Sequence, residues 1–442
     1  MKAPHIILIV ICLIQLSCKN NDDQILNNSV IGDLEFAQNY GGQKNESGQS
    51  VVATLDGGYA ILGYTQSTNG DITDKDEDSF DYWLLKFNAS NELLWSKTYG
   101  GTLDDRGNDI VATQDGGFAI TGYGSSNDND ISINNGNQDF WISKLDSDGN
   151  IIWEKSFGYS GSDRAYSIIQ TQDQGFLISG VLDVTASAGE GNSKNYFIEH
   201  AGGDYWAIKL DSNGNQEWTK YFGGNLSDDP YGITQTVDGN FILVGSSDSE
   251  DVDITNNKGS YDYWIVSISN SGVLLWEKNF GGTEIDEARG ITNTSDGNFL
   301  IIGNTRSNDV DVSNNIGGSD IWLLKISPFG ELLWEKTLGG TGFDIGNSIS
   351  KSINGYIISG ASRSLDGNIT GNNGQNDAFI TEINENGDLL WTKSVGGSNE
   401  DLIYDSVQIN DGTIVSVGET TSNDFDLNNN KGFTDLLVLK IK

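Results

Sequence analysis

Aspartate residues recur at regular intervals along this 442-residue chain, and they are the side chains with the clearest capacity for chemistry. In five polar segments, two Asp residues stand nine or ten positions apart. The pairs are Asp71 with Asp81, Asp130 with Asp139, Asp253 with Asp262, Asp311 with Asp320, and Asp426 with Asp435. Carboxylate oxygens are hard ligands, so these pairs predict Ca²⁺ sites, the only cofactor that the sequence suggests. The alternative is that they cap turns through local hydrogen bonds, because their spacing does not match an EF-hand loop.

A second acidic series follows a recurring pair of glycines. An acidic residue stands five positions after the first glycine of each pair, or of its equivalent, in seven places. These residues are Glu46, Asp105, Asp163, Asp228, Asp286, Asp344 and Asp401. Whether the two acidic series meet depends on the elements that carry them.

One segment departs from this regularity and is a candidate ligand site. Seven extra residues lie between Asp183 and Gly203, where Tyr196, Phe197 and His200 interrupt a polar stretch. Exposed aromatic side chains could stack on a sugar or on a partner side chain. The alternative is that Tyr196 and Phe197 pack a longer loop onto a neighbouring blade.

Signatures of catalysis are sparse. His200 is the only histidine beyond the first residues of the chain, which excludes a multi-histidine metal site. The sequence shows no phosphate-binding loop or dinucleotide fingerprint. Five arginines are spread too widely along the sequence to indicate an anion site: Arg106, Arg164, Arg289, Arg306 and Arg363. We therefore expect no catalytic residues and no enzymatic activity.

A sevenfold repeat positions all of these residues. The Asp that opens a D-[YFL]-W-like segment recurs at 57 to 58 residues, with one interval of 65 residues. Its seven members are Asp81, Asp139, Asp204, Asp262, Asp320, Asp377 and Asp435. Within each copy, four short stretches of alternating hydrophobicity are separated by Asp-Gly turns and one long polar loop, which indicates two hairpins. Seven units of four strands predict an all-β, seven-bladed β-propeller over residues 34–442.

The two ends of the repeat predict how the ring closes. Residues 34–40 match the fourth strand of the unit, and residues 435–441 match the third. An N-terminal strand can therefore complete the last blade and hide two sheet edges. If the first strand of each blade is innermost, the fourth-to-first connections and the second-to-third loops share one face, which we call the loop face. Both acidic series belong to it.

The first residues resemble an export signal. An apolar run from Ile6 to Leu16 is short for a membrane span, and Ser17 and Cys18 follow it. This arrangement resembles the lipobox of bacterial lipoproteins, which implies cleavage after residue 17 and acylation, for example palmitoylation, of Cys18. The polar residues 18–33 resemble the tether of Bacteroidota surface lipoproteins. We expect an outer-membrane lipoprotein at the cell surface that contacts the membrane only through its lipid.

The amino-acid composition limits the kinds of partner that the protein can bind. The 63 acidic residues against 25 Lys and Arg give a net charge of −38, which argues against binding nucleic acid or anionic lipid headgroups. A content of 36% hydrophobic and 10% aromatic residues is enough for a substantial core. We expect a folded monomer.

The repeat resembles one known family. The stretch 98–126, with its G-G-x-x-x-D step and D-G-G-F hairpin, and the following D-F-W-I-S-K-L are similar to the bacterial beta-propeller repeat family, SBBP. The resemblance covers residues 34–442 and implies a propeller outside the cytoplasm. That family has no single known activity, so it supplies no catalytic residues.

These observations lead to two functional hypotheses. The first is a surface-anchored, non-catalytic binding or scaffold protein that contacts a protein or envelope partner through its acidic loop face. The second is a carbohydrate-binding, lectin-like or glycan-processing lipoprotein. An aromatic-lined cleft would favour the second hypothesis, and an evenly acidic face would favour the first.

Overall fold

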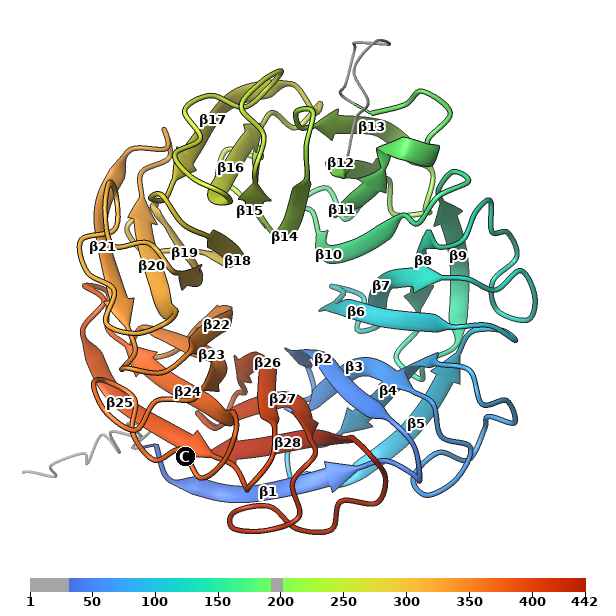
Figure 1. Cartoon of the computed structure of the whole chain (residues 1–442). Helices are drawn as coiled ribbons and strands as arrows, with labels where there is room; N and C mark the ends of the chain where they lie inside the picture. The colour runs from blue at the N-terminus through green and yellow to red at the C-terminus, as the bar shows by residue number, and fades with distance from the viewer. Residues whose placement is uncertain (1–31, 192–201) are drawn as a thin grey trace, which may run out of the picture.

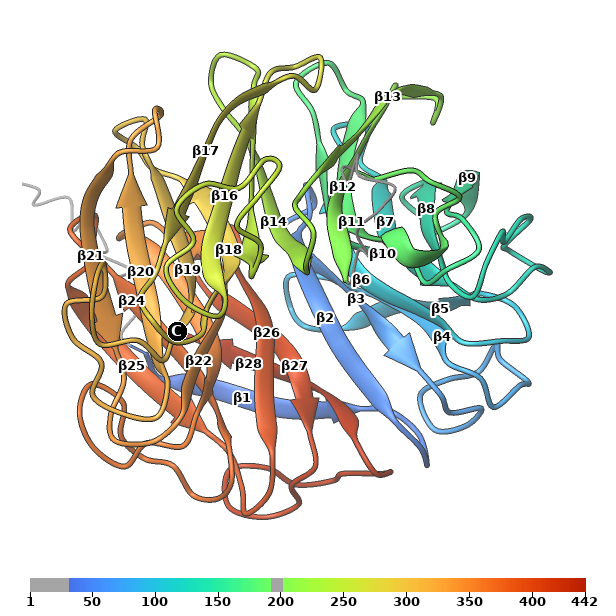
Figure 2. The same ribbon diagram turned by 45° about the horizontal axis from the view of Figure 1, so that its top comes forward.

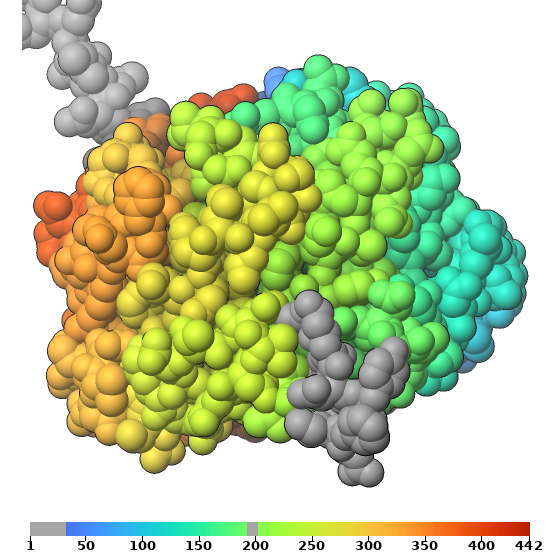
Figure 3. Space-filling model, turned by 90° about the horizontal axis from the view of Figure 1, so that it is seen from above, coloured from blue at the N-terminus to red at the C-terminus, as the bar shows by residue number. Residues whose placement is uncertain are grey.

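The computed structural model describes residues 32–191 and 202–442. It is a ring of seven antiparallel four-stranded sheets around a central axis (Figure 1). The predicted all-β, seven-bladed propeller is confirmed. Figure 2 shows the ring tilted, with β2, β14, β18 and β26 close to the axis. Figure 3 shows it from the rim, where the outer sides of the green to yellow segments form a continuous convex wall.

Each blade uses consecutive strands, ordered outward from the axis. Blade 1 is β2 (Glu46–Ala53), β3 (Tyr59–Thr65), β4 (Asp81–Phe87) and β5 (Leu93–Tyr99); blade 2 is β6 (Asp105–Ala112), β7 (Phe118–Gly124), β8 (Asp139–Leu145) and β9 (Ile151–Phe157); blade 3 is β10 (Arg164–Gln170), β11 (Phe176–Asp183), β12 (Gly203–Leu210) and β13 (Gln216–Phe222). Blade 4 is β14 (Asp228–Gln235), β15 (Phe241–Ser247), β16 (Asp262–Ile268) and β17 (Leu274–Phe280); blade 5 is β18 (Asp286–Asn293), β19 (Phe299–Thr305), β20 (Asp320–Ile326) and β21 (Leu332–Leu338); blade 6 is β22 (Asp344–Lys351), β23 (Tyr356–Ser362), β24 (Asp377–Ile383) and β25 (Leu389–Val395). Blade 7 is β26 (Asp401–Gln408), β27 (Ile414–Thr420), β28 (Asp435–Ile441) and, outermost, β1 (Leu34–Tyr40). A short 3₁₀ turn, η1 (Val184–Ala186), follows β11.

The Asp-Gly turns close the inner hairpin of each blade. In blade 2, the Asp115 carboxylate accepts hydrogen bonds from Thr113 Oγ1 at 2.5 Å and from Gly117 N at 3.1 Å. Gly116 adopts a φ of +85°, a conformation that residues with a Cβ rarely adopt. Lys144, from the third strand, lies with Nζ 3.0 Å from the same carboxylate. The D-G-G spacing therefore fixes both the turn and its link to the next hairpin.

Aromatic side chains form the core between neighbouring blades. The tyrosine before a buried tryptophan contacts the corresponding tryptophan of the next blade: Tyr82 and Trp141 lie 4.8 Å apart between ring centroids, and Tyr263 and Trp322 lie 4.7 Å apart. Each such contact contributes about 0.5–1.5 kcal/mol beyond simple burial. In blade 7, the buried Leu437 takes the tryptophan position. These buried rings therefore belong to the core between blades.

The ring closes through the N-terminal strand, as the sequence predicts. β1 pairs antiparallel with β28, with Ala37 opposite Leu439, and Asp33 and Lys442 exchange backbone hydrogen bonds of 3.0 and 2.9 Å. Blade 7 is thus built from both ends of the described chain (Figure 1). Among the residues that the structure describes, no helix is long and apolar enough to cross a membrane. Cys18 lies outside the described residues.

Candidate functional site

The acidic residues of the repeat converge on the glycine pairs. Between blades 4 and 5, Gly281 N donates to Asp311 at 3.2 Å and Gly282 N donates to Asp286 at 2.7 Å. A Cβ on Gly281 would lie 2.2 Å from Asp262 Oδ1 and 2.7 Å from Asp286 Oδ2. Three carboxylates from three chain segments therefore close around one glycine pair, an arrangement that we call a hub. Only glycine fits at its centre.

The two aspartates of one long loop contact two different hubs. Asp71 accepts a hydrogen bond from Gly41 N at 2.9 Å, at the hub that also contains Glu46 and Asp435. Asp81, from the same loop, lies instead against Gly100. Because Gly41 belongs to a fourth-to-first connection and Asp71 to a second-to-third loop, their bond confirms that both kinds of connection share the loop face.

Most of the aspartates predicted to bind calcium accept hydrogen bonds from backbone N–H groups of the protein. Asp130, Asp311 and Asp426 accept from the first glycine of a hub. Asp139, Asp262, Asp320 and Asp435 accept from the backbone N–H four residues earlier. Asp253 donates its backbone N–H to Gly223 O. Within residues 32–191 and 202–442, no group of three or more His, Cys, Asp or Glu side chains is arranged to hold a metal ion.

Burial makes several hub carboxyls unusually basic. The loss of solvent raises the pKa of Asp262, Asp320 and Asp435 to about 6, and the neighbouring hub carboxylate adds to the effect. One oxygen of each, Oδ1, is buried without a hydrogen-bond partner among the described residues. Such an oxygen can carry a proton at mildly acidic pH.

Blade 1 supplies its own cation at the equivalent place. Lys75 is buried, and its Nζ lies 3.1 Å from Asp81 Oδ2. Burial still raises the pKa of Asp81 to about 7, against the opposing effect of the Lys75 charge.

Exposed apolar side chains stand beside three hubs in a strained conformation. Val252, Val310 and Phe425 directly precede the loop aspartates, and their φ angles are 59°, 58° and 54°. Their exposed fractions are 49%, 64% and 70%. Equivalent positions in other blades carry residues that tolerate this conformation, for example Gly70 and Asn129. The two valines, being β-branched, are clear outliers there.

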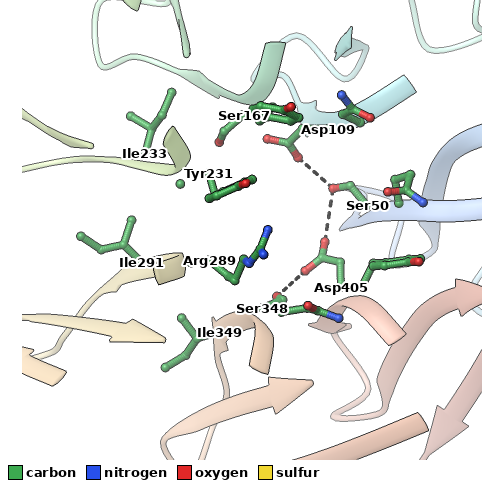
Figure 4. A pocket seen from close by; sticks show the side chains of 17 residues that line it. Ser50, Asp109, Ser167, Tyr231, Ile233, Arg289, Ile291, Ser348, Ile349 and Asp405 are labelled. Atoms are coloured by element: carbon green, nitrogen blue, oxygen red, sulfur yellow. Dashed lines mark hydrogen bonds between the residues drawn. The ribbon is translucent and has the colours of Figure 1, made fainter. Parts of the chain in front are cut away.

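The axis of the ring contains a polar cavity of about 200 Å³. Each innermost strand has a β-bulge, for example between Gly107 and Asp109, so two consecutive residues reach the cavity. Asp109 and Asp405 both accept from Ser50 Oγ, and Asp405 also accepts from Ser348 Oγ at 2.6 Å (Figure 4). This polar belt joins four neighbouring blades. Burial raises the pKa of Asp109 to about 7.

Arginine and tyrosine side chains lie next to one another from blade 2 to blade 5, and three of them, Tyr166, Tyr231 and Arg289, line the cavity. Arg289 extends into the cavity beside Tyr231 (Figure 4), with its guanidinium carbon 4.2 Å from the tyrosine ring centroid. Tyr231 contacts Tyr166 at 5.3 Å between centroids, and Arg164 lies 5.3 Å from the Tyr123 ring. Arg106, on β6, is paired in register with Tyr123. We call these six residues the axial arc.

None of the six axial-arc residues is among those that the sequence predicts to bind a ligand or a metal ion. The predicted aromatic residues Tyr196, Phe197 and His200 lie outside the described residues. A signal for the axial arc is nevertheless present in the repeat. Tyr166, Tyr231 and Arg289 all stand eight positions after the first glycine of a pair or its equivalent, where other copies have Gln49 or Asn108. Variation at one position of an otherwise regular repeat marks residues that the fold does not require.

The ring of seven four-stranded sheets defines a seven-bladed β-propeller. No family model and no curated protein matches the chain. Similar solved structures include a protein of unknown function from Dyadobacter fermentans, 12% identical, which covers 93% of this chain and 100% of its own with a TM-score of 0.45. A protein of unknown function from Bacteroides caccae is also 12% identical, with 72% and 94% coverage and a TM-score of 0.42. The Pan2 WD40 domain of Neurospora crassa is 8% identical, with 91% and 97% coverage and a TM-score of 0.46.

Proposed function

We propose that this propeller is a non-catalytic binding protein of the bacterial envelope that holds a protein partner on its loop face. In this proposal acylated Cys18 anchors the chain at the outer surface of the outer membrane, as in SBBP-like surface lipoproteins. The observation that carries the proposal is the placement of Val252, Val310 and Phe425. Each is exposed in a backbone conformation that costs about 1–2 kcal/mol for a residue with a Cβ. Side chains that strain the backbone in this way cluster at functional sites.

The surroundings of these side chains indicate the chemistry of the partner. The loop face carries both acidic series of the repeat, and the whole chain has a net charge of −38. A complementary protein surface would place apolar side chains over Val252, Val310 and Phe425 and surround them with Lys and Arg.

The test replaces Val310 by Asn, the residue that blade 2 has at the equivalent Asn129. We expect Val310→Asn to raise the free energy of unfolding by about 1 kcal/mol, because it relieves strain. On intact cells that produce the protein, we expect it to lose cross-linking to the protein captured by the unchanged chain. Val237→Asn is the matched control, since Val237 is 90% exposed in an Asp-Gly hairpin at the opposite end of the inner strands. Equal cross-linking of both variants would contradict the proposal.

A further inference from the structure

The five arginines of the chain, scattered in sequence, lie close to the hubs in the structure. Arg106 and Arg164 directly follow the hub residues Asp105 and Asp163, and Arg289 lies three residues after Asp286. Arg306 and Arg363 donate their backbone N–H groups to Ile285 O and Phe343 O, which directly precede hub aspartates. In a protein with a net charge of −38, the arginines are thus confined to the loop-face side.

Three of these arginines belong to the axial arc, and two of them retain an unused hydrogen-bond donor, whereas Arg164 Nε donates to Gln138 Oε1 at 2.6 Å. The Nε atoms of Arg106 and Arg289 are buried and have no acceptor among the residues that the structure describes. Arg289 is held by Glu287, with NH2 3.3 Å from the carboxylate, and by the face of Tyr231. A guanidinium oriented in this way presents a rigid set of donors that suits a carboxylate.

The carboxylates of the same cavity are already occupied by the ring itself. Asp109 accepts from Ile168 N at 2.8 Å, and Asp405 accepts from Val51 N at 2.9 Å, in addition to their bonds to serine hydroxyls. These bonds join neighbouring blades. The groups that remain for a ligand are therefore guanidinium donors, tyrosine faces and the amide oxygens of Gln49, Asn108 and Asn347. The NH2 groups of these three amides already donate to Ser47 Oγ, Ala165 O and Ile403 O.

We propose that the axial cavity binds a small hydroxylated carboxylate, of the type of a single hexuronate unit. The guanidinium of Arg289 pairs with the carboxylate, tyrosine faces of the axial arc pack against the ring, and side-chain amides bond its hydroxyls. The volume of about 200 Å³ is below the ~300–1,000 Å³ of pockets for drug-sized ligands, so the occupant is one small unit or the end of a chain. This site is separate from the loop-face contact, and neither depends on the other.

The test is calorimetric titration of the purified chain with D-glucuronate, D-glucose and acetate. We expect saturable one-to-one binding of glucuronate, and at least tenfold weaker binding of glucose, which lacks the charge, and of acetate, which lacks the ring. Arg289→Gln is expected to weaken glucuronate binding at least tenfold. Arg306→Gln, which removes an arginine outside the cavity, is expected to change it less than twofold.

A second variant separates loss of binding from loss of folding. Gln49→Glu keeps the shape of a half-buried side chain and every arginine, but it adds a negative charge to the cavity. Within the described residues, the side-chain partner of Gln49 is the Ser47 hydroxyl, which can donate to a carboxylate as well as accept from an amide. We expect this variant to weaken glucuronate binding at least tenfold with a melting temperature close to that of the unchanged chain. Equal binding of glucose and glucuronate, unchanged binding by Arg289→Gln or Gln49→Glu, or no saturable heat with glucuronate would overturn the proposal.

Discussion

The buried aspartate carboxyls of this ring differ in how their negative charge is balanced. Asp262, Asp320 and Asp435 each have a buried oxygen without a partner among the described residues, whereas Asp81 has Lys75 beside it. A buried charge is costly unless it is paired or neutralised by a proton. The ionised form of Asp81 is therefore paired directly with a fully buried lysine. Asp262 and Asp435 have only the less buried Lys258 and Lys431 nearby, which pair with other carboxylates of their hubs, so binding a proton is the more effective way to neutralise them.

Replacing Lys75 by Met is expected to destabilise the protein in a pH-dependent way. At pH 8 the variant leaves a buried, charged Asp81, and we expect a loss of about 3 kcal/mol. At pH 5 Asp81 is protonated, because its pKa is about 7 even with Lys75 present. The loss should then shrink to about 1 kcal/mol or less. Urea denaturation at both pH values measures the difference.

The matched control is Lys336→Met. Lys336 pairs with Asp388 at 2.9 Å in an exposed position, and hydrogen bonding to Lys336 and Asn384 lowers the pKa of Asp388. We expect a loss of at most about 1 kcal/mol, equal at pH 5 and pH 8. An equal loss at the two pH values for Lys75→Met would contradict the proton-linked account of the hub.

At the scale of the element, the closing strand is the one piece that the ring takes from the other end of the chain. β1 covers the edge of β28, and its Leu34 and Ala37 pack against the core between blades 6 and 7. Without it, a row of backbone groups and the adjoining core would be exposed.

A chain that begins at residue 43 is therefore expected to unfold at a lower temperature and to self-associate, compared with a chain that begins at residue 32. Size-exclusion chromatography and thermal melting test this. The control is a permutant that also begins at residue 43 but continues from Lys442 through an Asn-Gly turn into residues 33–42. Because Asp33 and Lys442 already exchange backbone hydrogen bonds, we expect it to be monomeric and stable. A monomeric, equally stable truncated chain would show that β1 is dispensable.

The sequence predicts the elements better than it predicts the site. Period, strand number and closure follow from local patterns that repeat seven times. The hub at Gly41 joins Asp71 to Asp435, which is 364 residues further along the chain, and no local pattern reveals that contact. The sequence pattern does not predict which residues line the axial cavity, because a bulge interrupts the alternation of each innermost strand. Neighbouring residues such as Asn108 and Asp109 therefore both line the cavity. Simple alternation would send one of them to the blade interior.

For the whole molecule, the repeated hubs combine into a common dependence on pH. Burial raises the pKa of Asp163, Asp262, Asp320, Asp377 and Asp435 to about 6, and that of Asp81 and Asp109 to about 7. Hydrogen bonds to Thr and Lys side chains act oppositely at the Asp-Gly turns and lower the pKa of Asp56 and Asp115 to about 2. The two groups titrate in different pH ranges.

The sign of the effect follows from which state binds more protons. Between about pH 4 and pH 7, the folded ring holds protons on carboxyls that would be ionised in the unfolded chain, so stability falls as pH rises through this range. Below about pH 4 the unfolded chain is protonated as well, and the charged Asp56 and Asp115 lose their contribution as pH falls toward 2. The charge of −38 acts in the same direction as the hubs, because protonation reduces repulsion.

We therefore expect maximum stability near pH 4 to 5, with a melting temperature about 5 °C or more above that at pH 8. Calorimetry from pH 3 to pH 8, repeated in 0.5 M NaCl, separates the two causes. Salt screens repulsion between surface charges but has little effect on the desolvation of buried carboxyls. A profile that becomes flat in salt would assign the pH dependence to surface charge, whereas a profile that keeps its slope would assign it to the buried carboxyls. A melting temperature that rises from pH 5 to pH 8 would show that the hub aspartates are ionised throughout.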